Sequence, residues 1–186
     1  MKKALAFLMA AVMLMSMLTA CGNKDNADKK DNNDVNTEET DKAAADKVAA
    51  LIDAIYVQER TEETDAQCEA AKAAWDALTD AQKALVEGEE ASPDYFGLDT
   101  GDASKDDPRN QDEIGEKELL VVSFGTSFND SRVADIKSIE DALQEANPDW
   151  SVRRAFTAQI IINHIQARDG EKIDNMEQAL ERAVAN

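Results

Sequence analysis

The sequence predicts an α/β fold in its last third, with a small all-α module and a disordered tether before it. Residues 119–124 form a continuous apolar run, which is typical of a strand buried on both faces of a parallel sheet. Apolar residues at helical spacing follow, and a second strand-like run covers residues 150–156, so strands and helices alternate from residue 118 onward. Residues 43–90 show only the helical period, and residues 21–42 carry almost no apolar side chains.

The first twenty residues have the pattern of an export signal. Lys2 and Lys3 precede an apolar run over residues 4–17, which is shorter than the ~20 residues that a membrane-spanning helix needs. The segment Leu18-Thr19-Ala20-Cys21 resembles a bacterial lipobox, in which the cysteine is diacylated and the chain is cleaved before it. We therefore expect a signal peptide over residues 1–20 and a lipidated Cys21 that anchors the protein to the membrane on its extracytoplasmic side. The alternative is a secreted protein in which Cys21 follows the small residues by chance.

The charge balance argues against nucleic acid as a partner. The chain carries 39 acidic and 20 basic side chains, a net charge of -19. A chain this acidic repels phosphate backbones, and no broad basic face can be built from it. Within it, residues 21–42 are rich in Asp, Asn, Lys and Glu, and we expect them to form a flexible tether.

A helical module is expected over residues 43–90. One stripe of apolar residues lies at i, i+3, i+4 and i+7 and a second follows it; the two comprise Val48, Leu51, Ile52, Ile55 and Cys68, Ala71, Trp75, Leu78. Thr64 with Gln67, and Thr79 with Gln82, have the spacing of capping boxes. The run from Ala77 to Val86 resembles small helical modules of exported Gram-positive proteins, which serve as spacers or interaction modules. Cys68 is expected to pack as a small apolar residue, with a redox role as the alternative.

Residues 91–117 are rich in Asp, Gly, Asn and Pro. The acids Asp99, Asp102, Asp106 and Asp107 invite a calcium interpretation, but their spacing does not match a calcium loop with alternating ligands and a closing Glu. We expect a solvated linker.

The elements of the α/β part can be placed from residue 118 to the end of the printed sequence. After the first strand, a helix carrying Val133, Ile136, Ile139 and Leu143 is expected to end before Pro148. The second strand is followed by a helix capped by Thr157, with Ile160, Ile161 and Ile165 apolar, that closes at Gly170. Asp174 and Glu177 open a last helix, with Met176, Leu180 and Val184 apolar. Because two strands leave wide apolar faces uncovered, we expect further strands beyond Asn186.

Three stretches of this part carry a family resemblance. They are the segment Leu120 to Ser127, the segment Arg154 to Thr157, and Arg168-Asp169-Gly170 with Ile173-Asp174. In order and spacing they are similar to the beginning of the anaerobic sirohydrochlorin cobaltochelatases, although Ala158 departs from the Ser that relatives often carry. The resemblance covers about a third of the chain, and its first stretch is the most specific.

The resemblance implies a chelatase-like open parallel sheet, of which residues 118–186 are the first, incomplete half-domain. It implies two similar α/β halves around a cleft and a lyase that inserts Co²⁺ into sirohydrochlorin during anaerobic cobalamin biosynthesis. The partners would be cobalt ion and sirohydrochlorin or another tetrapyrrole. The family's metal-binding and proton-accepting residues, two His and a Glu, are expected beyond Asn186. The printed chain is then expected to have no catalytic or metal-ligating residue and no bound cofactor, and to be inactive by itself.

The candidate substrate-binding residues follow the first strand and end the second. Gly125, Thr126, Ser127 and Phe128 form the loop at the carboxyl end of the first strand, where open α/β sheets bind ligands. The glycine would let a flat macrocycle approach, the hydroxyls could donate to its carboxylates, and Phe128 could stack on it. Arg154 matches the family motif and could hold a carboxylate bidentately. The alternatives are an ordinary strand-to-helix turn and a structural ion pair.

Two further expectations concern His164 and the class of function. His164, the only histidine, has no second ligand near it in sequence and is expected to be a partly exposed helix residue rather than a metal ligand. Because cobalamin synthesis is cytoplasmic and this chain carries an export signal, an exported lipoprotein that binds haem, another tetrapyrrole or a metal for uptake is the alternative to a chelatase. A surface interaction protein that works through its helical module is a third class.

Overall fold

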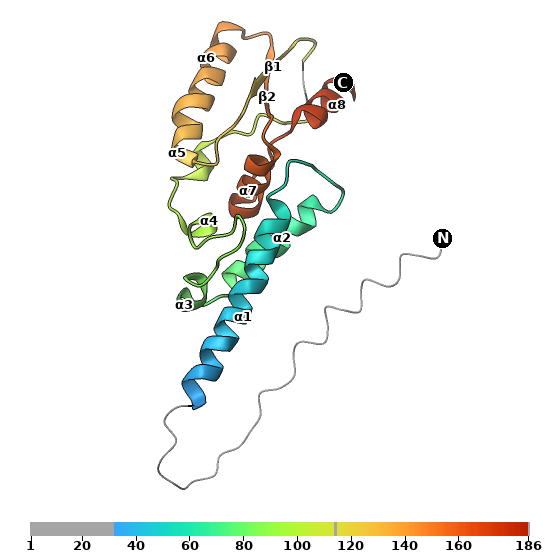
Figure 1. The fold of residues 1–186 in the computed structure, drawn as a ribbon. Helices are drawn as coiled ribbons and strands as arrows, with labels where there is room; N and C mark the ends of the chain where they lie inside the picture. Colours follow the sequence, from blue (N-terminus) through green and yellow to red (C-terminus); the bar gives the residue numbers. More distant parts are fainter. Residues whose placement is uncertain (1–31, 114, 186) are drawn as a thin grey trace, which may run out of the picture. The chain divides into compact units, whose positions relative to one another are not determined.

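The computed structural model describes residues 32–113 and 115–185, and side chains from residue 37 onward. Its first part is helical, with α1 (Asn32–Ile55), α2 (Thr64–Asp76) and α3 (Asp80–Lys83) (Figure 1). The tether was expected to reach residue 42, but α1 already begins at Asn32. The apolar stripe that starts near Ala45 anchors this helix, and helix formation extends cooperatively from it into the polar residues before. The rest of the expected tether, the signal peptide and Cys21 lie outside the described residues.

The helical part has an apolar core where the sequence placed it. Val48, Ile52 and Ile55 of α1 are at most 2% exposed, and Cys68, Ala71 and Trp75 of α2 face them. Cys68 is fully buried, as expected of a cysteine that packs like a small apolar residue. The two apolar stripes of the sequence therefore meet each other.

Only one of the two expected capping boxes forms. At α3, Thr79 accepts from the Gln82 backbone N–H, and the Gln82 side chain accepts from the Thr79 N–H, so this box is confirmed. The box at Thr64 is wrong, because Glu63 occupies the N-cap position of α2 and makes no side-chain cap. Thr64 already lies inside the helix, and its hydroxyl accepts from the Thr61 N–H at 2.9 Å instead.

Residues 91–117 hold two short helices, α4 (Asp94–Gly97) and η1 (Ala103–Lys105). The expectation of a solvated linker is wrong at several side chains, among them Ala91 and Thr100, which are 5% and 8% exposed. Tyr95 and Phe96 are at most 9% exposed and belong to the helical core, where Phe96 meets the Trp75 ring edge-on. The Asp106 carboxylate is 0% exposed. The amino-acid composition predicted a solvated segment because the segment is rich in acidic residues. Composition does not show which few of its side chains are buried by contacts with distant parts of the chain.

The α/β part confirms the expected order of elements. The strands β1 (Glu118–Ser123) and β2 (Ser151–Phe156) are parallel, with Glu118 opposite Ser151 and Ser123 opposite Phe156. Between them run α5 (Asn129–Ser131), the π-helical turn η2 (Arg132–Lys137) and α6 (Ser138–Ala146). After β2 come α7 (Gln159–Asp169), which ends at Gly170 in the left-handed conformation as expected, and α8 (Met176–Ala185). The helices α6 and α8 lie on opposite sides of the strand pair (Figure 1).

Three details of this part differ from the sequence predictions. The first strand is not buried on both faces: Val122 is 43% exposed, because β1 pairs only with β2 in the described part of the chain. On α6 the buried position is Glu140, and Ile139 is 58% exposed, because Glu140 pairs with an arginine of β2. Thr157 does not cap α7, which starts from Ala158 without a side-chain cap.

The described chain from Asp34 onward is one compact unit, and α7 joins its two cores. Ile162 and Ile165 pack with Phe156 of β2 and with Ile173, whereas Ala167 packs in the helical core. Because α7 meets both cores, most of its surface is buried and it lacks a solvent-facing stripe. Over residues 32–113 and 115–185, no helix is long and apolar enough to cross a membrane.

Candidate functional site at the carboxyl ends of β1 and β2

Gly125 lies near the start of the loop after β1, in a conformation that requires glycine. Its φ is +96°, and a Cβ at this position would lie 2.5 Å from the Phe156 ring, which is fully buried at the end of β2. The glycine therefore lets the loop pack on the neighbouring strand. This is a tight strand-to-helix turn.

The rest of the predicted loop is half-buried or exposed. Thr126 and Ser127 are half-buried, and the Thr126 hydroxyl accepts from the Phe128 backbone N–H at 3.2 Å. A hydroxyl that accepts one bond can still donate its own hydrogen to a ligand. The Ser127 carbonyl accepts from Arg168 at 2.7 Å, which ties the loop to the end of α7. The loop is thus attached to α7 through its backbone, while its side chains stay half-buried or exposed.

Two aromatic rings flank this loop. Phe128 is 49% exposed, as a stacking role requires, and Phe124 is 65% exposed. Sequence reasoning missed Phe124, because it counted the residue with the apolar run of the strand. The structure ends β1 at Ser123, so Phe124 belongs to the loop. Large exposed aromatic side chains next to a backbone loop can stack on a flat ligand.

Arg154 does not lie on an open surface. It is 1% exposed, and its guanidinium donates to Asp106 at 2.7 and 2.9 Å and to Glu140 at 2.9 and 2.7 Å. Burial alone would lower its pKa, but the two carboxylates outweigh burial and raise it. Of the two roles that the sequence left open, this arrangement is the structural ion pair, because both ends of the guanidinium fork are already occupied.

The ion pair is part of a larger buried network. Arg132 of η2, which is fully buried, donates to Asp106 at 2.5 Å and to Glu171 at 2.9 Å. Burial pushes the pKa of Asp106 up, but Arg154 and Arg132 outweigh it and hold that pKa below its usual value. For Glu171 burial prevails and raises the pKa. Sequence reasoning missed Asp106, Arg132 and Glu171, which come from three distant segments.

The opposite face of β2 carries an arginine of a different kind. Arg153 is 3% exposed, and one of its terminal nitrogens finds no hydrogen-bond partner among the described residues. Burial, followed by the charge of Arg182, lowers its pKa. Arg182 of α8 itself binds Asp174 and Asp112.

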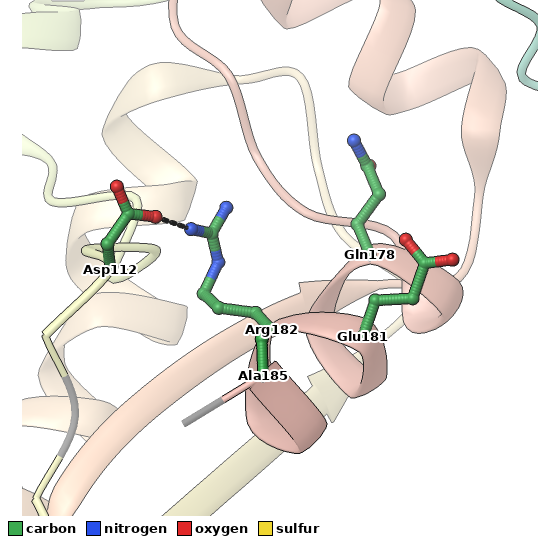
Figure 2. A pocket seen from close by; sticks show the side chains of 5 residues that line it. All are labelled: Asp112, Gln178, Glu181, Arg182 and Ala185. Atoms are coloured by element: carbon green, nitrogen blue, oxygen red, sulfur yellow. Dashed lines mark hydrogen bonds and ion pairs between the residues drawn. The ribbon is translucent and has the colours of Figure 1, made fainter.

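The helix α8 borders an open groove of about 510 Å³, lined by Asp112, Gln178, Glu181, Arg182 and Ala185. Figure 2 shows Arg182 reaching across to Asp112, with Glu181 turned away from that ion pair. None of the residues predicted for substrate binding lines this groove.

The comparisons with known proteins match the α/β part. The family model described as cobalt chelatase (CbiK) matches residues 117–186. Residues 117–186 are therefore similar to part of the cobalt chelatase family. The sirohydrochlorin cobaltochelatase of Salmonella typhimurium is 44% identical over 70 residues, which are 38% of this chain and 26% of that protein. The chain thus spans about a quarter of the length of this curated relative. No solved structure matches the chain.

The cobalt chelatase match divides the site residues. Gly125, Thr126, Ser127, Phe128 and Arg154 lie inside it, whereas Asp106 and the helical part lie before it. His164 also lies inside it, but its ring stacks on Tyr95 at 4.1 Å and its Nε2 lies 2.5 Å from the Tyr95 carbonyl oxygen. Within the described ranges, no group of three or more His, Cys, Asp or Glu side chains is placed to hold a metal ion.

Proposed function

We propose that the full-length protein is a sirohydrochlorin cobaltochelatase-like enzyme that inserts Co²⁺ into sirohydrochlorin. The 44% identity to a sirohydrochlorin cobaltochelatase over β1 to α8 is the observation that carries this proposal. The loop geometry supports it, because Gly125 keeps the backbone close to the sheet and leaves Phe124 and Phe128 exposed on either side. In this proposal the tetrapyrrole lies on the loop, and Co²⁺ is a substrate.

The residues described here would bind and orient the tetrapyrrole. Phe124 and Phe128 supply aromatic surface for a flat ring, and the Thr126 hydroxyl supplies a donor for one of its carboxylates. Deprotonation of the pyrrole nitrogens and delivery of the metal would fall to the two His and the Glu that the resemblance places beyond Asn186. The part of the site seen here is therefore a binding platform.

The experiment is cobalt insertion into sirohydrochlorin, followed by absorbance, with the full-length protein. Phe128→Ala and Phe124→Ala should each weaken tetrapyrrole binding about tenfold, as loss of a stacking ring commonly does. Ile139→Ala is the matched control, since Ile139 is a large apolar residue with 58% exposure on α6, outside the loop. Wild-type protein that neither binds sirohydrochlorin nor inserts cobalt would refute the proposal.

A second candidate is an exported lipoprotein that captures haem, another tetrapyrrole or a metal ion for uptake. The export signal and the lipobox-like segment ending in Cys21 favour it, because cobalamin synthesis takes place in the cytoplasm. Both functions would use the same loop, and turnover separates them. An enzyme converts many equivalents of sirohydrochlorin, whereas a binding protein saturates at one ligand and releases it unchanged.

We also propose that Cys21 is diacylated and anchors the protein outside the cytoplasm. The wild-type protein should then fractionate with membranes, and a Cys21→Ala variant should lose both the lipid and the mature size. Serine at position 16 provides a control, because Ser16→Ala changes the apolar run without removing the acceptor sulfur. Mature-sized Cys21→Ala protein in the membrane fraction would contradict the proposal.

A further inference from the structure

A short segment before the family match holds the loop that the tetrapyrrole would contact. This segment, residues 99–109, is called the strap below. The Thr100 carbonyl accepts from the Asp130 backbone N–H at 2.9 Å, and the Gly101 carbonyl accepts from the Asn129 side chain at 3.1 Å. Asn129 is 2% exposed and immediately follows the loop of residues 125–128. The strap therefore fixes the point where the loop ends.

The strap reaches the start of the loop's helix and the end of β2 through a single carboxylate. Asp106 accepts from Arg132 at 2.5 Å and from both terminal nitrogens of Arg154 at 2.7 and 2.9 Å, and all three side chains are 0% exposed. Charge-assisted bonds of this length, withdrawn from water, are among the stronger polar contacts in proteins. Asp106 thus joins two elements on either side of the loop.

The backbone of the strap is strained at Arg109. Its φ is +51°, which is uncommon for a residue with a side chain. Two contacts hold it there: the Arg109 carbonyl accepts from the Arg154 N–H at 3.3 Å, and its guanidinium pairs with Asp141 at 2.5 Å. A strained residue persists where its surroundings over-determine it, which is a sign that the strap has one defined position.

We propose that Asp106 is a positioning residue for the tetrapyrrole-binding loop of residues 125–128, so that a segment outside the cobalt chelatase match is part of the binding site. The inference rests on the proposed function for its ligand. Its physical basis is preorganisation. A loop already held in its binding conformation loses less freedom when the ligand arrives, and its apparent affinity is not reduced by a population of open states.

The test compares Asp106→Asn with Asp53→Asn in the full-length protein. Asp53 accepts from the backbone N–H groups of Glu89, Glu90 and Ala91, so its replacement weakens the helical part and leaves the loop contacts in place. Two readouts are taken on folded protein: hydrogen exchange of the backbone amides of residues 125–132, and the Kd for sirohydrochlorin by absorbance titration. Thermal unfolding establishes that both variants are folded at the temperature used.

Asp106→Asn should speed exchange in residues 125–132 about tenfold and raise the Kd about tenfold, because a competent fraction of about one tenth raises an apparent Kd by that factor. Asp53→Asn should change neither, even where it lowers the melting temperature as much. Unchanged exchange in Asp106→Asn, or equal changes in both variants, would overturn the inference. The exchange readout needs no ligand, so it decides the role of Asp106 even if wild-type protein fails to bind sirohydrochlorin and the proposed function falls.

Discussion

The Asn163 side chain donates a 2.7 Å hydrogen bond to the backbone carbonyl of Ile55. Asn163 belongs to α7 inside the cobalt chelatase match, and Ile55 is the last residue of α1 outside it. A carbonyl at a helix end has no partner within its own helix, and here water cannot supply one, because Ile55 and Asn163 are both at most 1% exposed. The helical part is therefore attached to the α/β part by a specific polar contact as well as by apolar packing.

Replacing Asn163 with Ala should lower the free energy of unfolding by about 1–3 kcal/mol, which is the cost of leaving a buried carbonyl without a donor. Asn147→Ala is the matched control. Asn147 also donates to a helix-end carbonyl, that of Leu143 at 2.9 Å, but it is only half-buried, so that water can replace the lost donor. Urea unfolding measures both. An Asn163→Ala variant as stable as Asn147→Ala would contradict the role of this bond.

The sequence was sufficient for the elements that local rules determine. The apolar stripe through Val48 and Ile52, the box at Thr79 and the stop at Gly170 depend on spacing and on backbone conformation within a few residues. Each of these signals lies within a short stretch of the sequence and can be recognised without knowledge of the rest of the fold. The two strands were also found, to within a residue or two at their ends.

What the sequence could not give are the partners of charged side chains. The sequence did not distinguish Asp106 from the other acids of an acidic segment, and it did not show which of the many acids pairs with Arg154. Asp106 and Arg154 are 48 residues apart, so no periodicity relates them. The same limit explains Ile139: on an amphipathic helix it was expected to face the core, but burial of the neighbouring Glu140 against Arg154 turned it outward.

His164 should make the protein lose stability as pH falls below its unfolded pKa. Burial, followed by the charge of Arg168, lowers the pKa of His164 from 6.5 to about 4. Between these values the unfolded chain binds a proton that the folded chain does not, so the stability contributed at this site decreases by about 1.4 kcal/mol for each pH unit lost. Above pH 7 the histidine is neutral in both states and contributes no slope.

The comparison variant is His164→Gln, which can still donate to the Tyr95 carbonyl but does not ionise. Urea unfolding of both proteins from pH 7.5 to pH 5 gives the difference in unfolding free energy, from which the many carboxylates cancel. Below about pH 6.5 the free energy of unfolding of the wild type should fall steadily relative to that of the variant. A difference that stays constant with pH would show that His164 titrates normally in the folded protein.

Cys68 should be inert in the folded protein. Its side chain is fully buried, its sulfur lies 3.6 Å from the Asn163 carbonyl oxygen, and burial raises its pKa to about 11. The thiolate is the reactive form, so alkylation by iodoacetamide at pH 8 should be at least about a hundredfold slower than in denaturant. Mass spectrometry of a chain with Cys21 replaced by Ser follows this thiol alone. Rapid labelling without denaturant would restore the redox alternative.

The adjacent arginines of β2 should respond in opposite ways to the same substitution. Arg154→Met removes the partner of two fully buried carboxylates, Asp106 and Glu140, and breaking a buried ion pair from one side costs about 3–5 kcal/mol. Arg153 is as deeply buried, yet one of its terminal nitrogens has no partner in the described part of the chain, and burial lowers its pKa. Replacing such a group with an apolar side chain of similar length removes a desolvation cost and loses little. Arg153→Met should therefore be neutral or stabilising.

Urea unfolding at pH 7.5 compares the two variants with wild type, and because they differ by one position on the same strand, strand propensity cancels between them. Glu118 decides what a contrary result would mean: it lies near Arg153 at the start of β1, and one of its carboxylate oxygens is also buried without a partner among the residues that the structure describes. If Arg153→Met is as destabilising as Arg154→Met, Arg153 and Glu118 pair in solution, and a Glu118→Gln variant should then lose the same stability.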